Sequence, residues 1–314
     1  MGCCLAAMLC FSAVPVFLRH LTGYLDAWTV NAVRYGVSAV FWLPFVVALS
    51  RRSARPVIPA TTPRQSRSIF LAALVPSVPN LIGQIGWATC PYYLDAPSIG
   101  FLIRTSFLFT ALMGFVFIPA ERPLIRRPLF AVGTVLCLAG VGGLYAERLG
   151  DAGVSGETRW IGLAVVLGTS LCWGGYAVAV RHFLQPYPLR LAFGVVSLYT
   201  TAGLVAMALA FGKVHQLASL PPREWLLLIG SAMLGITFGH VLFHRGIHGV
   251  GPIVASGVTM AGAFVTYALA VAFLGETMTA LQLLGGLGIV AGGLALVRAK
   301  AQVETPAAME AEIP

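Results

Sequence analysis

The chain contains an internal duplication, because a segment near its start returns near its middle. Residues 9–20 (LCFSAVPVFLRH) match residues 171–182 (LCWGGYAVAVRH) at an offset of 162. A second echo links 96–121 to 251–276 at an offset of 155, so the two halves differ by an insertion of seven residues. A repeat of this length in an apolar chain predicts a membrane protein built from two related helix bundles around a shared centre.

The apolar content excludes a water-soluble globule. Hydrophobic residues make up 58% of the chain and charged residues 10%, against about 25% charged in soluble domains. A helix needs about 20 apolar residues to cross a bilayer. We therefore predict an all-α integral membrane protein with ten transmembrane helices, two repeats of five, in the segments 3–19, 28–50, 69–88, 96–118, 128–146, 160–180, 190–211, 224–244, 252–274 and 280–297.

The basic residues predict how the spans are oriented. With the N-terminus in the cytoplasm, thirteen Lys and Arg fall in inner loops and five in outer loops, so the positive-inside rule places both termini in the cytoplasm. Five spans per repeat is an odd number, so the second repeat enters the membrane from the opposite side. The repeats are therefore inverted. The net charge of +9 is then explained by the basic residues of the cytoplasmic loops, and nucleic acid is not an expected partner.

The chain divides into a first repeat (1–146), a linker (147–158), a second repeat (159–298) and a tail (299–314). The tail is acidic and has few bulky residues, so we expect it to be disordered. No cleavable signal peptide is visible, and the first apolar run is expected to remain as a span. The six scattered cysteines are expected to be small buried hydrophobic residues.

The sequence resembles the EamA-type transporters of the drug/metabolite transporter superfamily over almost its whole length. Both repeats carry a small-acidic pair after the fourth span, Ala120-Glu121 and Gly275-Glu276. Arg34 matches an arginine that many members carry near the start of the second span. The final span of each repeat is rich in glycine: Gly133, Gly140, Gly142 and Gly143, then Gly285, Gly286, Gly288, Gly292 and Gly293.

The resemblance implies export or exchange of small metabolites by alternating access. It implies a central cavity lined mainly by the third, fourth, eighth and ninth helices. The superfamily handles amino acids, nucleobases, nucleotide sugars and drugs, so the resemblance does not choose the substrate.

Arg104 lies about 10 Å from the outer end of the fourth span, at 1.5 Å per residue. A charge at this depth costs at least about 2.5–3.5 kcal/mol and normally faces a wet cavity or a partner. In a cavity, its planar fork suits a carboxylate or phosphate, which predicts an anionic or zwitterionic substrate. A structural partner and snorkelling to the interface are the alternatives. Asp26 and Asp95 are candidate partners for this arginine and for Arg34.

Two polar stripes are expected to face inward, because polar groups facing lipid are costly. The third span has Ser77, Asn80, Gln84 and Trp87 at helical spacing, for contact with the substrate or between helices. The ninth span has Ser256, Thr259 and Thr266. Thr259 is the repeat counterpart of Arg104, so the pseudo-two-fold axis would place both on one cavity. Back-bonding within the helix is the alternative for these hydroxyls.

Other candidate substrate-binding residues lie on the second, sixth and ninth spans. Arg34, in a stripe with Asn31, Tyr35, Ser38 and Trp42, would assist Arg104 in an outer vestibule or anchor the second span. Trp173, Tyr176 and Tyr267 would line the cavity for ring-bearing or ammonium-bearing substrates, or pack between helices.

His240, His244 and His248 recur every four residues at the inner end of the eighth span. They suggest a role for His240 in proton coupling or substrate contact, metal binding, or interfacial packing. No Cys or carboxylate accompanies them at ligand spacing, so no metal and no other cofactor is predicted. Glu121 and Glu276 are expected to be a structural or gating pair, capping the next helix electrostatically; proton coupling is the alternative.

A transporter is the favoured function class. An intramembrane enzyme would need paired carboxylates or a nucleophile with its base, and the few acidic residues form no such pair. A receptor or scaffold is the other rival class, while a lipid-linked sugar flippase and a drug exporter are variants of transport. The expected location is the cytoplasmic membrane. The glycine-rich fifth and tenth spans permit a homodimer.

Overall fold

The computed structural model describes residues 2–53, 68–150, 156–184, 187–243, 245–246 and 258–311. Within these residues every regular element is helical. The α-helices are α1 Gly2–Leu21, α2 Ala27–Ser53, α3 Ile69–Thr89, α4 Ala96–Leu102, α5 Ser106–Phe117, α6 Pro128–Gly150, α7 Gly156–Leu184, α8 Leu189–Phe211, α9 Pro222–Ala232, α11 Gly262–Leu274 and α12 Ala280–Ala311. Short turns lie between them: η2 Cys90–Tyr92, η3 Ile103–Thr105, η4 Pro119–Arg126, η5 Val214–Ser219 and the π-helical segment η6 Met233–Phe238.

The helices confirm the predicted all-α membrane architecture. Eight of them are long and apolar enough to cross a bilayer, and two shorter apolar helices, Pro128–Leu144 and Val258–Leu274, occupy the remaining predicted spans. Large apolar side chains on the outside, including Val40, Leu209, Leu226 and Phe273, are at least 70% exposed. In water such a surface would be unfavourable, whereas in a bilayer it faces lipid.

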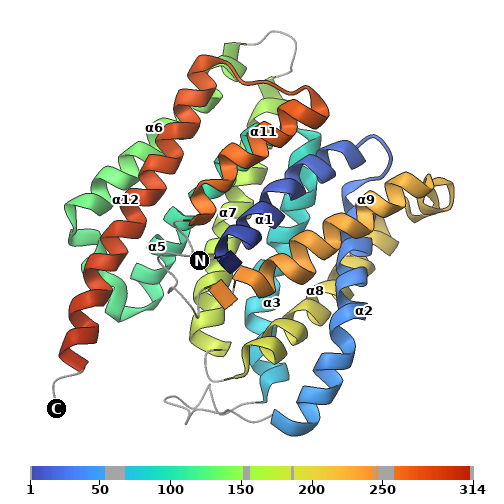
Figure 1. The fold of residues 1–314 in the computed structure, drawn as a ribbon, viewed down its shortest axis with the longest axis horizontal. Coiled ribbons are helices and arrows are strands. Elements are labelled where there is room, and N and C mark those ends of the chain that lie inside the picture. Colours follow the sequence, from blue (N-terminus) through green and yellow to red (C-terminus); the bar gives the residue numbers. More distant parts are fainter. Residues whose placement is uncertain are drawn as a thin grey trace.

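Helix pairing follows the duplication. Three pairs join equivalent helices of the two repeats: α6 with α12, α2 with α8, and α4 with α11. Other pairs occur twice in exchanged form, because α5 packs on α7 as α11 packs on α1, and α3 packs on α7 as α9 and η6 pack on α1. Figure 1 shows α6 beside α12 on one side of the bundle and α2, α3 and α8 on the other. This exchange of partners is what two inverted repeats require.

The glycines of the last span of each repeat bring α6 and α12 together within one chain. A Cβ on Gly140 would lie 2.6 Å from the backbone oxygen of Gly285, and a Cβ on Gly292 would lie 2.6 Å from that of Gly133. Any side chain at these positions would separate the two helices. The contact for which the sequence suggested a homodimer is therefore used within the chain.

The structure differs from the expected ends of the repeats. α6 continues to Gly150 and α7 begins at Gly156, so both helices extend into the predicted linker. Residues 299–314 were expected to be disordered, whereas α12 continues through Ala311. The continuation begins Ala-Lys-Ala-Gln, which are good helix formers, and it follows an established helix without a new nucleation step.

Candidate functional site

Arg104 lies in a tight turn that interrupts the fourth span. Asp95 begins α4 by accepting a hydrogen bond from the Ser98 backbone nitrogen at 2.7 Å. After two turns the helix narrows to the 3₁₀ segment Ile103–Thr105, where the Thr105 hydroxyl donates to the Leu102 carbonyl at 2.7 Å. Such a segment within a helix often marks a functional hinge. Arg104 therefore projects from a break between α4 and α5.

The guanidinium of Arg104 lies against the crossing of α1 and α11. A Cβ added to Gly262 would lie 2.8 Å from Arg104 Nη2 and 2.7 Å from Ser12 Oγ. The Arg104 Nε atom is buried and has no hydrogen-bond partner. Among the described residues no carboxylate lies within 4 Å of this guanidinium. Its charge is thus left available to a ligand.

The helices around Arg104 are held together by small residues and backbone hydrogen bonds. Thr266 of α11 donates to the Ser12 carbonyl of α1 at 2.9 Å and to its own helix at Gly262 at 3.1 Å. A Cβ on Gly100 of α4 would lie 2.9 Å from Thr266. Thr266 therefore joins α1 to α11. Thr259 lies in the short helical stretch before α11, and Ser256 falls outside the described residues.

The stripe on α3 faces inward, as its polar side chains required. Ser77, Asn80, Gln84 and Trp87 are all buried. Asn80 donates to the Thr200 hydroxyl of α8 at 2.9 Å, and the Gln84 carbonyl accepts from Asn31 of α2 at 2.6 Å. These bonds join α3 to its neighbours, which is the interhelical contact that the sequence offered as one alternative.

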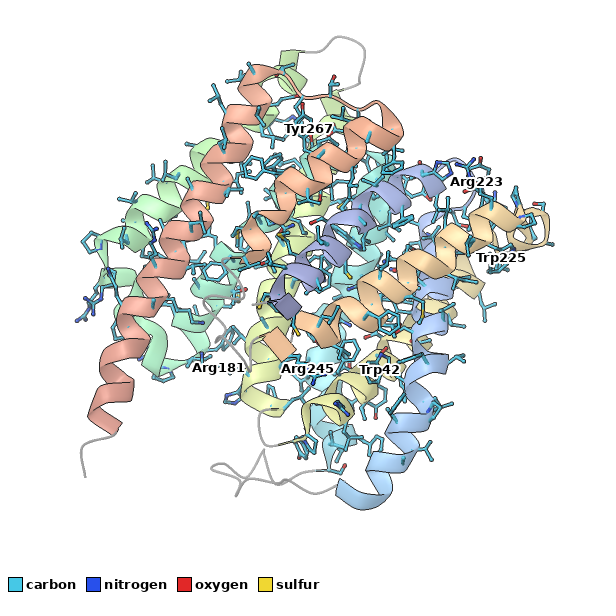
Figure 2. The ribbon with its side chains drawn as sticks, viewed as in Figure 1. Trp42, Arg181, Arg223, Trp225, Arg245 and Tyr267 are labelled. Atoms are coloured by element: carbon cyan, nitrogen blue, oxygen red, sulfur yellow. The ribbon has the colours of Figure 1, made fainter. Side chains whose placement is uncertain are left out.

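The aromatic candidates lie in two places. Trp87 of α3 and Trp173 of α7 have ring centroids 5.1 Å apart, and a Cβ on Gly83 would meet the Trp173 ring at 2.8 Å. Trp173 and Tyr267 both pack on the central apolar cluster that contains Trp87, and Figure 2 shows Tyr267 on α11. Tyr176 packs instead on a separate cluster formed mainly by α7 and α8.

Arg34 lies on a different side of α1 from Arg104. Its side chain is 1% exposed, and its Nη2 atom donates a long hydrogen bond of 3.4 Å to the Ser231 carbonyl. A Cβ on Gly235 would lie 2.6 Å from Val14 and 3.2 Å from Arg34 Nη2. Val14 and Ser12 are two positions apart on α1 and do not share a face. The two arginines thus flank α1.

His240 follows the π-helical segment and packs between aromatic rings. Its ring stacks on Phe193 with centroids 5.2 Å apart and meets the edge of Phe11 at the same separation. Its Nδ1 atom lies 2.9 Å from the Gly235 carbonyl. The described residues contain no group of three potential metal ligands. His244 and His248 lie outside the described residues.

Glu276 lies at the end of the bundle that carries the C-terminus of α1. Its Oε1 atom is 2.7 Å from Arg19 Nε, and its Oε2 atom accepts from the Ala96 backbone nitrogen at 2.8 Å. It therefore caps α4 in addition to pairing with α1. Its repeat counterpart Glu121 lies in η4, and the structure does not describe its side chain.

The family follows from comparison with known proteins. A family model described as the EamA-like transporter family matches residues 1–146 and 160–298, one match for each repeat. The chain belongs to the EamA-like transporter family. A crystal structure titled only "Crystal structure of protein" has a TM-score of 0.60 and 18% identity, covering 99% of this chain and 97% of that one. At that identity it supports the fold alone. No curated protein matches the chain.

Several residues of this EamA-like transporter were not singled out from sequence. Gly262 and Ser12 lie next to the Arg104 guanidinium, and Gly235 lies next to the Arg34 guanidinium. Ser12 falls within the first repeated segment, where the other repeat has Gly174, so the two copies differ at this position. That difference between the repeats was the one sequence feature that could have singled out Ser12. Gly235 and Gly262 have no such feature, because the residue that each contacts lies on a helix distant in sequence.

Proposed function

We propose that this EamA-like transporter is a secondary carrier that exports or exchanges small metabolites with a carboxylate or similar anionic group across the cytoplasmic membrane. The observation that carries the proposal is the Arg104 guanidinium, which lies deep in the bundle at a helix break and has no carboxylate partner among the described residues. A planar guanidinium binds a carboxylate through two parallel hydrogen bonds. Amino-acid-like substrates fit this chemistry.

The surroundings of Arg104 favour a ligand over a structural partner. If an arginine only joined helices, we would expect its guanidinium to donate hydrogen bonds to carbonyls or carboxylates of the neighbouring helices. Arg104 instead lies beside Gly262, which has no side chain, and Ser12, whose hydroxyl donates at 2.6 Å to its own helix at Met8. Interrupted helices that expose a polar group near the middle of the membrane are a feature of transporter binding sites.

Alternating access is supported by the contacts at one end of the bundle. Arg19 pairs with Glu276, and the adjacent His20 Nε2 lies 2.8 Å from Glu224 at the start of α9. The end of α1 is thus tied to α4, α9 and the segment after α11, and we expect these contacts to break when this end opens. The positive-inside count makes it the outer end, with both chain termini in the cytoplasm. The sequence has no G-x-x-x-x-G-K-[ST] motif, so we expect gradients to drive transport.

The test is uptake of labelled amino acids and organic acids into liposomes containing the purified protein. Arg104→Gln should abolish uptake while the detergent-solubilised protein elutes and unfolds like the wild type. Arg223→Gln, which removes an exposed arginine at the start of α9 (Figure 2), is the matched control and should transport normally. Normal uptake by Arg104→Gln would remove this residue from the site. No uptake of any compound by the wild type would favour lipid-linked, cationic or drug substrates.

A further inference from the structure

Arg34 carries a buried positive charge that the described residues do not neutralise. The side chain is 1% exposed, and its Nε and Nη1 atoms have no hydrogen-bond partner. Its one hydrogen bond within the described part of the chain goes to the Ser231 carbonyl and is 3.4 Å long. No described carboxylate lies within 4 Å. An arginine stays protonated in proteins, and an unpaired buried charge costs several kcal/mol. A compensating negative charge is therefore required.

Further polar groups around Arg34 also lack partners. Ser38 lies one turn further along α2, and its buried hydroxyl has no hydrogen-bond partner. This hydroxyl can donate to an anion. Asn31, one turn before Arg34, has an amide oxygen without a partner among the described residues, but an amide oxygen only accepts hydrogen bonds and would not bind an anion. Its amide nitrogen already donates to the Gln84 backbone carbonyl.

His240 contacts the same part of η6 as Arg34 without adding a donor for an anion. Arg34 Nη2 approaches Gly235 from the α2 side, and His240 Nδ1 lies 2.9 Å from the Gly235 carbonyl. A carbonyl only accepts, so Nδ1 carries the proton, and in this tautomer the Nε2 atom has a lone pair that accepts hydrogen bonds. The donors that we assign to an anion are therefore those of Arg34 and Ser38.

We propose that Arg34, together with Ser38, forms a second binding site that holds one small monovalent anion between α2 and the π-helical segment of the eighth span. Chloride and the carboxylate of a metabolite share the chemistry that this site recognises: one negative charge that accepts several hydrogen bonds. The widened helical turn at η6 is consistent with such a site, because π-helical turns often occur at functional sites. The site is separate from Arg104 and does not depend on the proposed transport activity.

The test measures binding through stability, so it needs no transport. A ligand that binds only the folded protein raises the melting temperature in proportion to the logarithm of its concentration. Purified protein in detergent is heated in buffers where chloride replaces MES, a bulky sulfonate without a carboxylate, at constant ionic strength, which keeps charge screening unchanged. A parallel series replaces MES with acetate. We expect the melting temperature of the wild type to rise by about 3 °C or more when the anion concentration is well above its Kd. A rise in one series and not the other identifies the source.

Variants locate the effect. Arg104→Gln should keep the full rise, whereas Arg34→Gln should lose it. Because Arg34→Gln removes a buried charge and is at risk of folding differently, Ser38→Ala is the second variant. The Ser38 hydroxyl has no partner among the described residues, so the change should leave the melting temperature in the reference buffer close to that of the wild type. It should weaken anion binding at least threefold, seen as a shift of the concentration dependence.

Two results would overturn the proposal. The first is a wild-type melting temperature that responds to neither chloride nor acetate. The second is an anion effect of full size in both Arg34→Gln and Ser38→Ala, which would place the anion elsewhere. Loss of the effect in Arg104→Gln together with its persistence in Arg34→Gln would assign the anion to the proposed substrate site instead.

Discussion

Arg19 and Glu276 are 257 residues apart in sequence and form an ion pair with Nε and Oε1 2.7 Å apart. The second carboxylate oxygen of Glu276 accepts from the Ala96 backbone nitrogen, and the second arm of Arg19 donates to the Pro91 carbonyl at 2.6 Å. The Glu276 carboxylate therefore connects three parts of the bundle: the end of α1, the start of α4 and the segment after α11, to which Glu276 itself belongs. The sequence led us to expect Glu276 to cap the next helix along the chain, α12, whereas the helix that its carboxylate caps is α4 of the opposite repeat.

Replacing Glu276 with Ala should therefore weaken the whole end of the bundle. Arg19 loses its ion pair and Ala96 its helix cap, which together should lower the free energy of unfolding by about 1–3 kcal/mol, reduced by the partial exposure of the pair. Thermal unfolding in detergent measures the loss. Arg223→Gln is the control and should leave the melting temperature unchanged. An unchanged value in Glu276→Ala would mean that the pair does not stabilise the fold.

Asp26 should make this end of the bundle sensitive to acid. Its carboxylate accepts from the Thr29 hydroxyl and from the backbone nitrogens of Thr29, Trp28 and Lys213. Burial alone would raise the pKa of Asp26, but these hydrogen bonds outweigh it and hold the pKa below its ordinary value. The stabilisation is complete above the unfolded pKa of about 4 and is lost as pH falls through the lower folded pKa.

Asp26→Asn should consequently lower the melting temperature near neutral pH and not in strong acid. Melting curves recorded between neutral pH and pH 3 should converge as the wild-type carboxylate becomes protonated. A gap of constant size at every pH would show that the carboxylate charge does not contribute and that only the geometry of the side chain matters.

The close contact between α6 and α12 should not tolerate a side chain in place of its glycines. In Gly140→Ala the new methyl group would lie 2.6 Å from the backbone of both Gly285 and Ile289, and backbone atoms cannot move aside cheaply. Overpacking of this kind typically costs about 1–3 kcal/mol. Gly142→Ala, on the same helix, has nothing within 4 Å of the added carbon and should be neutral or slightly stabilising. Equal melting temperatures for the two variants would contradict this packing.

The sequence predicted the parts of this fold that depend on local apolar pattern. All ten spans were found, because a run of about 20 apolar residues is itself the requirement for crossing a bilayer. The stripe from Ser77 to Trp87 was correctly turned inward, because the helical period fixes which residues share a face.

Features that depend on tertiary contact could not be predicted. The 3₁₀ turn at Arg104 and the π-helical segment at Met233–Phe238 have no proline or other local signal. The close approach of Gly262 to Arg104 joins helices that are distant in sequence, as does the pair between Arg19 and Glu276. The cost of a charge inside the membrane favoured an inward position for Arg104, but only the packed structure places Arg34 and Arg104 on different sides of α1.

Gly262 should act as a positioning residue for Arg104. In Gly262→Ala the added carbon would meet Arg104 Nη2 at 2.8 Å and Ser12 Oγ at 2.7 Å. Both atoms are at the ends of side chains, so they can move aside and the protein should still fold. The guanidinium would then be displaced from its place, and a small displacement of a binding group weakens binding strongly. We expect the KM for uptake to rise about tenfold, equivalent to about 1.4 kcal/mol.

Gly168→Ala on α7 is the matched control, because nothing lies within 4 Å of its added carbon. It should have the KM and melting temperature of the wild type. If Gly262→Ala raises the KM while Arg104→Gln abolishes uptake, the two residues act on one step, and the double variant should be no worse than Arg104→Gln alone. A normal KM in Gly262→Ala would mean that Arg104 reaches the substrate from a position that Gly262 does not set.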